Sequence, residues 1–453
     1  MKKCLPFKTI LFFNLFLFGT IMKTNAQWVE VGGTNTSSFN STIYTLTTDP
    51  SGKVYAAGQF SNYTGNFYVA EWNGSSWIEV GGINIYTFAS GYIYALLTDA
   101  AGNVYAGGDF TNGNGNNYVA KWNGSSWTEL GGTNTSTLKG GIWALAMDAA
   151  GNVYAGGDFT NGNGNNYVAK WNGSSWSELG GTNTSTFNGL IMSIATDVSG
   201  NIFVGGWPTS AANKYYVAQW NGNSWSELGG TFNGYITSIV TDASGNVYVG
   251  GAFGDANEKN FIAMWNGSSW TELGGINTST FNGPVFCLAT DGLGVYAGGQ
   301  FVNASGNHYV GMWNGSSWSE LGGSNTSTFN NPIFCLNIDA SGNKYAGGAF
   351  SNGKDYGYVA EWGSITTAVV NTQLPSGNNT VQLFPNPAQS VITVNSPFTK
   401  GEVTITDLGG RLIFQSPITG TQTQLDISNL SKGVYVVSLL SDSEKLTGKL
   451  VVE

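Results

Sequence analysis

Apolar and polar positions along the chain form short alternating runs. In residues 92–132, the apolar runs "YIYALLTD", "VYAGGDF", "YVAKW" and "SWTELGG" are separated by the polar runs "AAGN", "TNGNGNN" and "NGSS". Short apolar runs bounded by Gly, Asn and Ser predict strands joined by turns. Several runs are apolar at consecutive positions, which suits strands packed on both faces. This stretch therefore predicts four short antiparallel strands.

The same unit recurs along the chain. Three patterns, W-x-E-[LV]-G-G, one close to D-x-x-G-N-V-Y-A-G-G and one close to Y-V-A-x-W, each occur seven times at spacings of 45 to 50 residues. Four strands per repeat at this period are typical of a β-propeller blade. The first copy is a lone fourth strand at residues 28–33, and the last copy ends at residue 362 without one. Pairing these two segments would close a ring.

The fold class that we expect is all-β, with a seven-bladed β-propeller over residues 27–363 followed by a small β-sandwich. The unit resembles the kelch-type repeat, because the doublet Gly107-Gly108 is followed by Tyr118 and then Trp122. That resemblance implies an architecture and no particular function.

The end of the chain departs from the repeat. Residues 364–380 form a polar linker, and residues 381–453 alternate turn signals with short β runs, which predicts the β-sandwich. Four blocks, "LFPNPAQSVITV", "VTITDLGGRLIF", "LDISNLSKGVYVVSL" and "KLTGKLVV", make this part similar to the C-terminal sorting domain of the type IX secretion system of Bacteroidetes-type bacteria. The sorting-motif residues are Phe384, Pro385, Asn386, Pro387, Asp407, Gly410, Gly433 and Tyr435.

This resemblance implies an export address that the outer-membrane secretion machinery reads and that is usually cut off. The cargo is then released or attached to the cell surface. The family usually has Tyr where Phe384 stands. An ordinary accessory β-sandwich is the alternative.

The N-terminus predicts a signal peptide over residues 1–26. A basic start precedes the apolar stretch 10–22, and we expect cleavage between Ala26 and Gln27. That stretch is too short to span a bilayer comfortably, and we expect no transmembrane segment. Removing the signal peptide removes four lysines, so the net charge moves from −10 to −14. An acidic chain with no arginine in residues 27–363 is a poor nucleic-acid binder.

Several residue types that often carry chemistry have structural explanations here. Asp99 and its equivalents sit in "D-x-x-G-N" and predict turns. Glu129 and its equivalents are expected at a solvated outer edge. Cys287 and Cys335 occupy a position that is small in every repeat and predict apolar fillers. His308, the only histidine, takes the place of an Asn at the end of a loop and suggests a surface substitution.

Metal and cofactor chemistry find little support. The loop "TNGNGNN" resembles a calcium loop written with neutral amides, and hard cations prefer charged oxygens. A lone histidine lacks a partner for a metal or catalytic group. We therefore expect no metal and no cofactor. A paired-carboxylate hydrolase needs no motif and stays open, although no acid pair breaks the repeat in two adjacent places.

The repeats diverge mainly in one set of loops. The connections between second and third strands and between fourth and first strands share one face of a propeller, and loops on a rigid scaffold often carry function. Trp207 stands where other repeats carry Asp, Gln or Ala. The ligand-binding set predicted on this face is Trp207, Tyr63, Asp109, Asp158, Asp255, Glu258, Lys259, His308 and Asp355. Neutral drift in exposed loops is the alternative.

These patterns lead to a leading functional hypothesis. We expect an exported, monomeric, non-catalytic binding or display protein whose ligand is a glycan or another surface macromolecule. A secreted polysaccharide-active enzyme and a purely structural surface protein are the alternatives. The repeated "WNGSSW" hexapeptide places an Asn-Gly at a hairpin tip, so its two tryptophans are expected to pack between blades and not to bind sugar.

Overall fold

The chain folds into two units, residues 1–366 and residues 367–453. The computed structural model describes residues 26–452. The exceptions are residues 36, 83–87, 89–90, 186, 208–213, 275–280, 365–380, 397–398, 407–411, 419, 432 and 442–444.

The first unit contains, within the described residues, seven four-stranded antiparallel sheets, here called blades I to VII. Blade I is formed by β2 (Ile43–Thr48), β3 (Val54–Gly58), β4 (Ala70–Trp72) and β5 (Trp77–Glu79). Blade II is formed by β6 (Ile93–Thr98), β7 (Val104–Gly108), β8 (Ala120–Trp122) and β9 (Trp127–Glu129). Blade III is formed by β10 (Ile142–Met147), β11 (Val153–Gly157), β12 (Ala169–Trp171) and β13 (Trp176–Glu178). Blade IV is formed by β14 (Ile191–Thr196), β15 (Ile202–Gly206), β16 (Tyr215–Trp220) and β17 (Trp225–Phe232). Blade V is formed by β18 (Ile236–Thr241), β19 (Val247–Gly251), β20 (Ala263–Trp265) and β21 (Trp270–Glu272). Blade VI is formed by β22 (Val285–Thr290), β23 (Val295–Gly299), β24 (Gly311–Trp313) and β25 (Trp318–Glu320). Blade VII is formed by β26 (Ile333–Ile338), β27 (Lys344–Gly348), β28 (Ala360–Ser364) and β1 (Ala26–Glu30).

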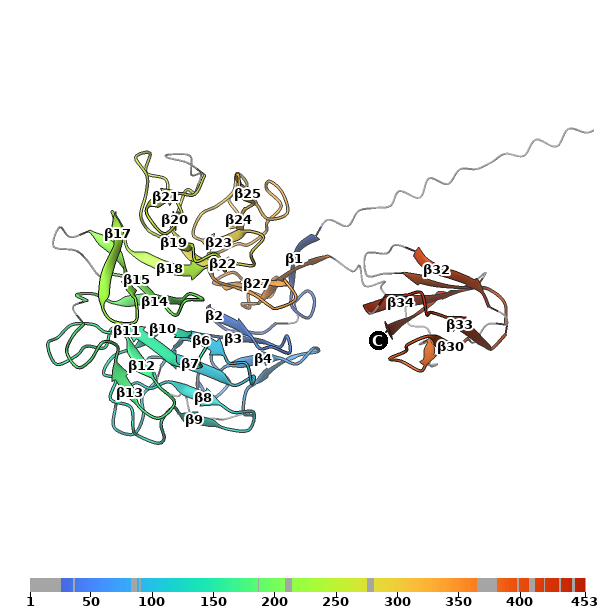
Figure 1. Cartoon of the computed structure of the whole chain (residues 1–453), viewed down its shortest axis with the longest axis horizontal. Coiled ribbons are helices and arrows are strands. Elements are labelled where there is room, and N and C mark those ends of the chain that lie inside the picture. Colours follow the sequence, from blue (N-terminus) through green and yellow to red (C-terminus); the bar gives the residue numbers. More distant parts are fainter. Residues whose placement is uncertain are drawn as a thin grey trace, which may run out of the picture. The chain divides into compact units, whose positions relative to one another are not determined.

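The blades form a closed β-propeller. The first strand of each blade lies nearest the centre and the fourth lies at the rim (Figure 1). Each first strand contacts the first strands of the two neighbouring blades, and β2 contacts β26. The N-terminal β1 pairs with β28, with Trp28 opposite Trp362, and so supplies the fourth strand of blade VII. Non-covalent pairing of the two ends therefore completes the ring.

The cores of the propeller lie between blades. Each of its seven hydrophobic clusters combines residues of two neighbouring blades, such as Val69 of blade I with Phe110 of blade II. Both faces of every blade are therefore covered, which explains the consecutive apolar positions in the sequence.

The repeated tryptophans serve this packing. In all seven blades the two tryptophans are directly opposed across the third and fourth strands, with ring centroids 5.6–5.8 Å apart. Trp127 also lies against Phe88, 5.0 Å away, and donates its indole N–H to the Val80 carbonyl of the preceding blade. The packing interpretation of the "WNGSSW" hexapeptide is therefore confirmed.

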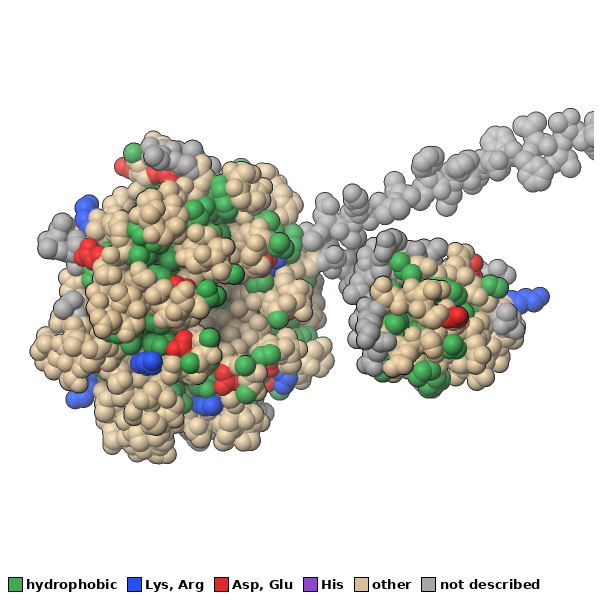
Figure 2. Space-filling model, in the orientation of Figure 1, with side chains coloured by type: hydrophobic (Ala, Val, Ile, Leu, Met, Phe, Trp, Pro, Cys, Tyr) green, Lys and Arg blue, Asp and Glu red, His purple; other side chains and the backbone are tan. Residues whose placement is uncertain are grey.

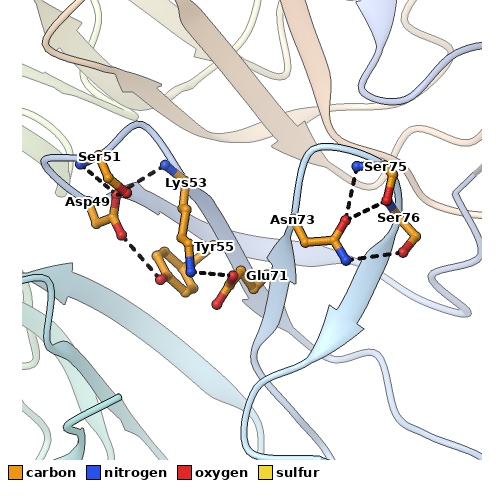
Figure 3. Close-up of polar contacts among 8 residues, drawn as sticks. All are labelled: Asp49, Ser51, Lys53, Tyr55, Glu71, Asn73, Ser75 and Ser76. Carbon is orange, nitrogen blue, oxygen red and sulfur yellow. Dashed lines mark hydrogen bonds and ion pairs between the residues drawn. The ribbon is translucent and has the colours of Figure 1, made fainter.

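The short turns on one face are fixed by side-chain hydrogen bonds (Figure 3). Asp49 accepts bonds from the backbone N–H groups of Ser51 and Lys53, at 2.8 and 3.0 Å. The equivalent Asp of every other blade accepts the N–H two residues further on. In the hairpin tip, Asn73 Oδ1 accepts the N–H groups of Ser75 and Ser76, both at 2.9 Å. The prediction that the repeated Asp is a turn residue is confirmed.

The predicted solvated edge for the repeated Glu is wrong for Glu30, Glu129, Glu178 and Glu320, whereas Glu227 is exposed as predicted. Glu129 accepts the backbone N–H groups of Asn134 and Ser136, at 2.6 and 2.5 Å, and the side-chain amide of Asn112 at 3.1 Å. Glu30, Glu178 and Glu320 make the same two backbone bonds. The carboxylate therefore ties together both loops of the opposite, longer-looped face, called here the loop face. Strand position alone did not indicate these contacts.

The two cysteines behave as predicted. Cys287 and Cys335 are buried free thiols at the equivalent position of β22 and β26, and burial raises the pKa of both. At the same position in other blades, Thr45 and Ser193 accept a backbone N–H from the next blade, at 3.1 and 2.9 Å. A small side chain is required there because two first strands approach closely.

The second unit is a small β-sandwich. One sheet has the order β29 (Gln382–Phe384), β30 (Val391–Asn395), β33 (Gln422–Asp426). The other has the order β32 (Leu412–Pro417), β31 (Glu402–Thr406), β34 (Gly433–Leu440), β35 (Lys445–Val452). Alternate residues such as Ile392, Ile405 and Val437 form one buried core between the sheets.

The described sorting-motif residues lie in β29 and β34 or directly after β29. Asn386 accepts the backbone N–H of Val451 at 2.9 Å, and Tyr435 donates its hydroxyl to the Ser431 carbonyl at 2.7 Å. Phe384 is half exposed. Pro385 and Pro387 follow cis peptide bonds. Asp407 and Gly410 lie outside the described residues.

Charge is sparse on the surface. One face of the propeller shows a central hollow with only scattered charged side chains around it (Figure 2), in line with a charged content of 10%. Within the described part of the chain, no helix has the length and hydropathy needed to cross a membrane.

Candidate functional site

A doublet of small residues, Gly-Gly in six blades and Ala57-Gly58 in blade I, ends the second strand of every blade. At the last glycine of the doublet, such as Gly108, a Cβ would collide with the backbone carbonyl oxygen of Tyr92, the residue before the first strand. The six equivalent glycines show the same close approach. The strand ladder skips one residue there: Ile93 pairs with Gly108, and Ala95 pairs with Gly107. The doublet thus permits a β-bulge, and a bulge re-aims the side chain of the extra residue.

The bulged residues form the first row of the candidate site. They share one register at the loop-face end of the seven first strands, and all are partly buried. The row is Tyr44, Tyr94, Trp143, Met192, Thr237, Phe286 and Phe334.

Five of these side chains form a continuous aromatic arc. Trp143 stacks on Tyr94 with ring centroids 4.2 Å apart, and Tyr94 lies 5.7 Å from Tyr44. Phe334 lies 5.9 Å from Tyr44 and stacks on Phe286 at 5.2 Å. The arc therefore runs through blades III, II, I, VII and VI. Aromatic rings from five consecutive blades that touch one another must lie around the propeller axis.

A second row directly follows the last glycine of the doublet in each blade. Each member donates its backbone N–H to the residue that precedes the bulged strand, which fixes its place beside the first row. The row is Gln59, Asp109, Asp158, Trp207, Ala252, Gln300 and Ala349.

Side chains connect the two rows. Tyr44 donates its hydroxyl to Gln59 at 3.0 Å, and Tyr94 donates its hydroxyl to Asp109 at 2.6 Å. We call these two rows together the axial mouth. It combines aromatic surface with a few polar groups, which is the usual composition of a small-ligand site.

Two carboxylates of the axial mouth flank one glycine. A Cβ on Gly141 would collide with Asp109 Oδ1 and would lie 3.1 Å from the indole nitrogen of Trp143 and 3.6 Å from Asp158 Oδ1. Burial raises the pKa of Asp158, and the neighbouring charge of Asp109 raises it further, while backbone N–H groups partly offset both. The sequence analysis sought an acid pair that breaks the repeat in two adjacent places and did not identify this one. The pair was hidden because the two repeats are identical at this point.

Trp207 provides a second aromatic platform. It is 49% exposed and stacks on Tyr235 with centroids 5.5 Å apart. Its backbone N–H is bonded to the Leu190 carbonyl at 2.9 Å, so the platform stands on the same frame as the two carboxylates. The structure thus places Trp207, Asp109 and Asp158 of the predicted set in one row.

The other predicted residues lie on the outer loops, away from the two rows. Asp255 accepts the backbone N–H groups of Asn257 and Lys259, so its carboxylate forms a turn. Glu258 and Asp355 have φ values of 60° and 62°, in the turn position that is Gly in other blades. Tyr63 is 80% exposed. The structure does not bring these loop residues together with the axial mouth.

The predicted surface place of His308 is wrong. The equivalent Asn117 is buried and donates to the carbonyls of Gly108 and Phe110, at 3.3 and 3.4 Å. His308 is partly buried, its Nδ1 is buried without a hydrogen-bond partner, and burial lowers its pKa. The backbone N–H of His308 donates to the Phe329 carbonyl at 2.9 Å and so joins the two loops of the loop face.

None of the first-row residues was predicted from the sequence as part of a site. Its members vary inside an apolar strand, where variation is normally explained by packing. The available signal was the glycine doublet, which predicts close backbone approach and hence a bulge. Within the described residues, no group of three or more His, Cys, Asp or Glu side chains could hold a metal ion.

Comparison with known families explains the second unit. Residues 382–453 match the family described as the secretion system C-terminal sorting domain. Such a domain is the part of an exported protein that the secretion machinery recognises. The protein is therefore exported and is either secreted or held at the outer cell surface. None of the curated proteins matches the chain.

Solved structures resemble the chain in fold. The extracellular domain of a hybrid two component system from B. thetaiotaomicron has a TM-score of 0.52 and 13% identity, covering 94% of this chain and 59% of that one. The protein YCF48, solved with a bound peptide, has a TM-score of 0.50 and 12% identity, covering 78% and 97%. PorZ, a surface component of the type-IX secretion system of Porphyromonas gingivalis, has a TM-score of 0.47 and 15% identity, covering 93% and 60%. The chain spans about three fifths of the length of PorZ and of the two component protein.

Proposed function

We propose that this exported protein is a non-catalytic glycan-binding protein and that the axial mouth holds the glycan. The observation that carries the proposal is the aromatic arc of five touching rings at one register of the ring. Sugar rings present apolar C–H faces that pack on aromatic side chains, and their hydroxyl groups need hydrogen-bonding partners. Gln59, Asp109, Asp158 and Gln300 stand in the second row to supply such partners. The kelch-type character of the repeat stays a prediction.

The test uses the mature chain, residues 27–453, on a panel of immobilised polysaccharides and oligosaccharides. We expect binding to at least one glycan. Trp207→Ala should lower the affinity about 10-fold, since an aromatic ring that a sugar covers on binding contributes about 1.4 kcal/mol. The control is Tyr63→Ala, which removes an exposed aromatic ring from an outer loop and should leave the affinity unchanged. An equal loss for Tyr63→Ala would move the site to the outer loops, and no binding to any glycan would refute the proposal.

One observation favours a second candidate function. Asp109 and Asp158 flank Gly141 on adjacent blades, and the pKa of Asp158 is raised, as a glycoside hydrolase with paired carboxylates requires. Release of reducing ends from the bound glycan, measured in the same preparation, separates the two functions. Turnover that Asp158→Asn abolishes would establish the hydrolase and refute the binding protein.

A further inference from the structure

The charge of the axial mouth is one-sided. Asp109 and Asp158 are the charged members of the two rows, which contain neither lysine nor arginine. In the described part of the chain, neither carboxylate takes part in an ion pair; the ion pairs found there are Lys53–Glu71 and Lys344–Asp291, in the short turns. Lys139, close in sequence, is exposed. Two negative charges therefore stand beside the aromatic arc without a cationic partner among the described residues.

A single position brings these charges together. The residue before the bulged strand is Gly141 in blade III, whereas the six other blades carry Thr42, Tyr92, Leu190, Tyr235, Pro284 and Pro332. A side chain at Gly141 would collide with Asp109 Oδ1. The indole nitrogen of Trp143, at the same place, is buried and has no hydrogen-bond partner. The notch at Gly141 thus gathers two carboxylates and one free donor against the Trp143–Tyr94 stack.

We propose that the axial mouth selects glycans that carry free amino groups, with the ammonium group held between Asp109 and Asp158 and the sugar ring against the Trp143–Tyr94 stack. This inference rests on the proposed function. A charged hydrogen bond in a partly buried site is about twice as strong as a neutral one. The hydroxyl groups of a neutral glycan can donate to the two carboxylates but cannot neutralise their charge. The face of an aromatic ring also attracts a cation.

Other occupants fit less well. A calcium ion takes six to eight oxygen ligands, and the notch offers two carboxylates, one of which already accepts the hydroxyl of Tyr94. An acidic glycan would be repelled by both carboxylates.

The test compares three hexasaccharides with the same β-1,4 linkage: those of glucose, N-acetylglucosamine and glucosamine. Affinities of the mature chain are measured by calorimetry at pH 6 with EDTA, where the amine is protonated. We expect the glucosamine hexamer to bind about 10-fold more tightly than the other two, and this preference to fall as salt rises. Equal affinity for the three would overturn the inference and leave the proposed function standing. Binding of none of the three would overturn the inference, and the full glycan panel would then decide the proposed function.

Matched variants assign the effect to residues. Asp158→Asn, at an exposed side chain, should reduce the affinity for the glucosamine hexamer about 10-fold and leave the N-acetylated one unchanged. Asp109→Asn should do the same if thermal melting shows it folded. Glu258→Gln removes an equal charge from an outer loop and should change neither affinity. Lys139→Ala should raise the affinity for the amine. A Glu258→Gln effect as large as that of Asp158→Asn would overturn the inference.

Discussion

The two faces of the propeller solve different problems with the same repeat. On the face with the short turns, every blade has the same Asp-anchored turn, and the paired tryptophans sit at nearly identical hairpins. On the loop face, the axial mouth carries seven different combinations of side chains. The positions that are the same in all blades hold the blades together, because the same contact is repeated between each pair of neighbouring blades. Divergent positions are free of that constraint, and therefore can acquire a ligand.

Gly108 affects both the packing of its blade and the shape of the axial mouth. Its substitution should therefore give the largest effect on stability and on binding. Gly108→Ala would drive a Cβ into the carbonyl oxygen of Tyr92 and remove the bulge that places Tyr94. We expect a loss of about 2–4 kcal/mol in the free energy of unfolding, measured with denaturant, together with loss of glycan binding. The control is Gly363→Ala, whose Cβ would meet nothing within 4 Å and which should be neutral. Retention of both stability and binding in Gly108→Ala would contradict the role of the bulge.

The tryptophans separate packing from binding. Trp127→Ala removes the contact with Phe88 and the hydrogen bond to Val80 of the preceding blade. We expect a loss of about 2–3 kcal/mol, below the usual cost in a full core because Trp127 is only partly buried. Trp207→Ala, by contrast, should cost less than about 1 kcal/mol while weakening glycan binding. Equal destabilisation by the two variants, in the same denaturant titration, would remove the distinction between the faces.

The scaffold could be predicted from sequence because repetition makes it visible. The Asp turn and the Trp pair each occur seven times, so a structural role explains both better than a role in one site. The fold class follows from the order of these repeats. The site was predictable only where it broke the repeat, as at Trp207. Tyr94 and Trp143 were missed because a bulge, not strand alternation, decides where they point. Asp109 and Asp158 were found, but their approach depends on the missing side chain of Gly141, which no pattern within one repeat reveals.

The repeated Glu tests whether the loop face is organised by its own carboxylates. Glu129→Ala leaves the N–H groups of Asn134 and Ser136 without their acceptor, so we expect a loss of about 1–2 kcal/mol in thermal or denaturant unfolding. Glu227 stands at the same place in blade IV, where β17 runs on through Phe232 and replaces the loop. It is exposed, and Glu227→Ala should therefore cost far less. Similar losses in both variants would mean that the carboxylate contributes through the strand and not through the loop.

The smallest expected effect concerns the stability of the mouth itself. Because burial and Asp109 raise the pKa of Asp158 above its unfolded value, the ionised carboxylate is disfavoured in the folded state. Its penalty is present at neutral pH and disappears as the pH falls through the usual carboxyl range near about 4, where Asp158 becomes protonated in both states. Asp158→Asn should thus stabilise the propeller at pH 7 by less than about 1 kcal/mol, since the side chain is exposed, and should have no effect at pH 3. Glu258→Gln removes the same net charge from an outer loop and serves as the control. A larger gain in the free energy of unfolding for Asp158→Asn than for Glu258→Gln would show that the repulsion between Asp158 and Asp109 is the cause. A larger gain for Asp158→Asn would support the proposal that this carboxylate serves a ligand, because a carboxylate that lowers stability does not contribute to the packing of the blades.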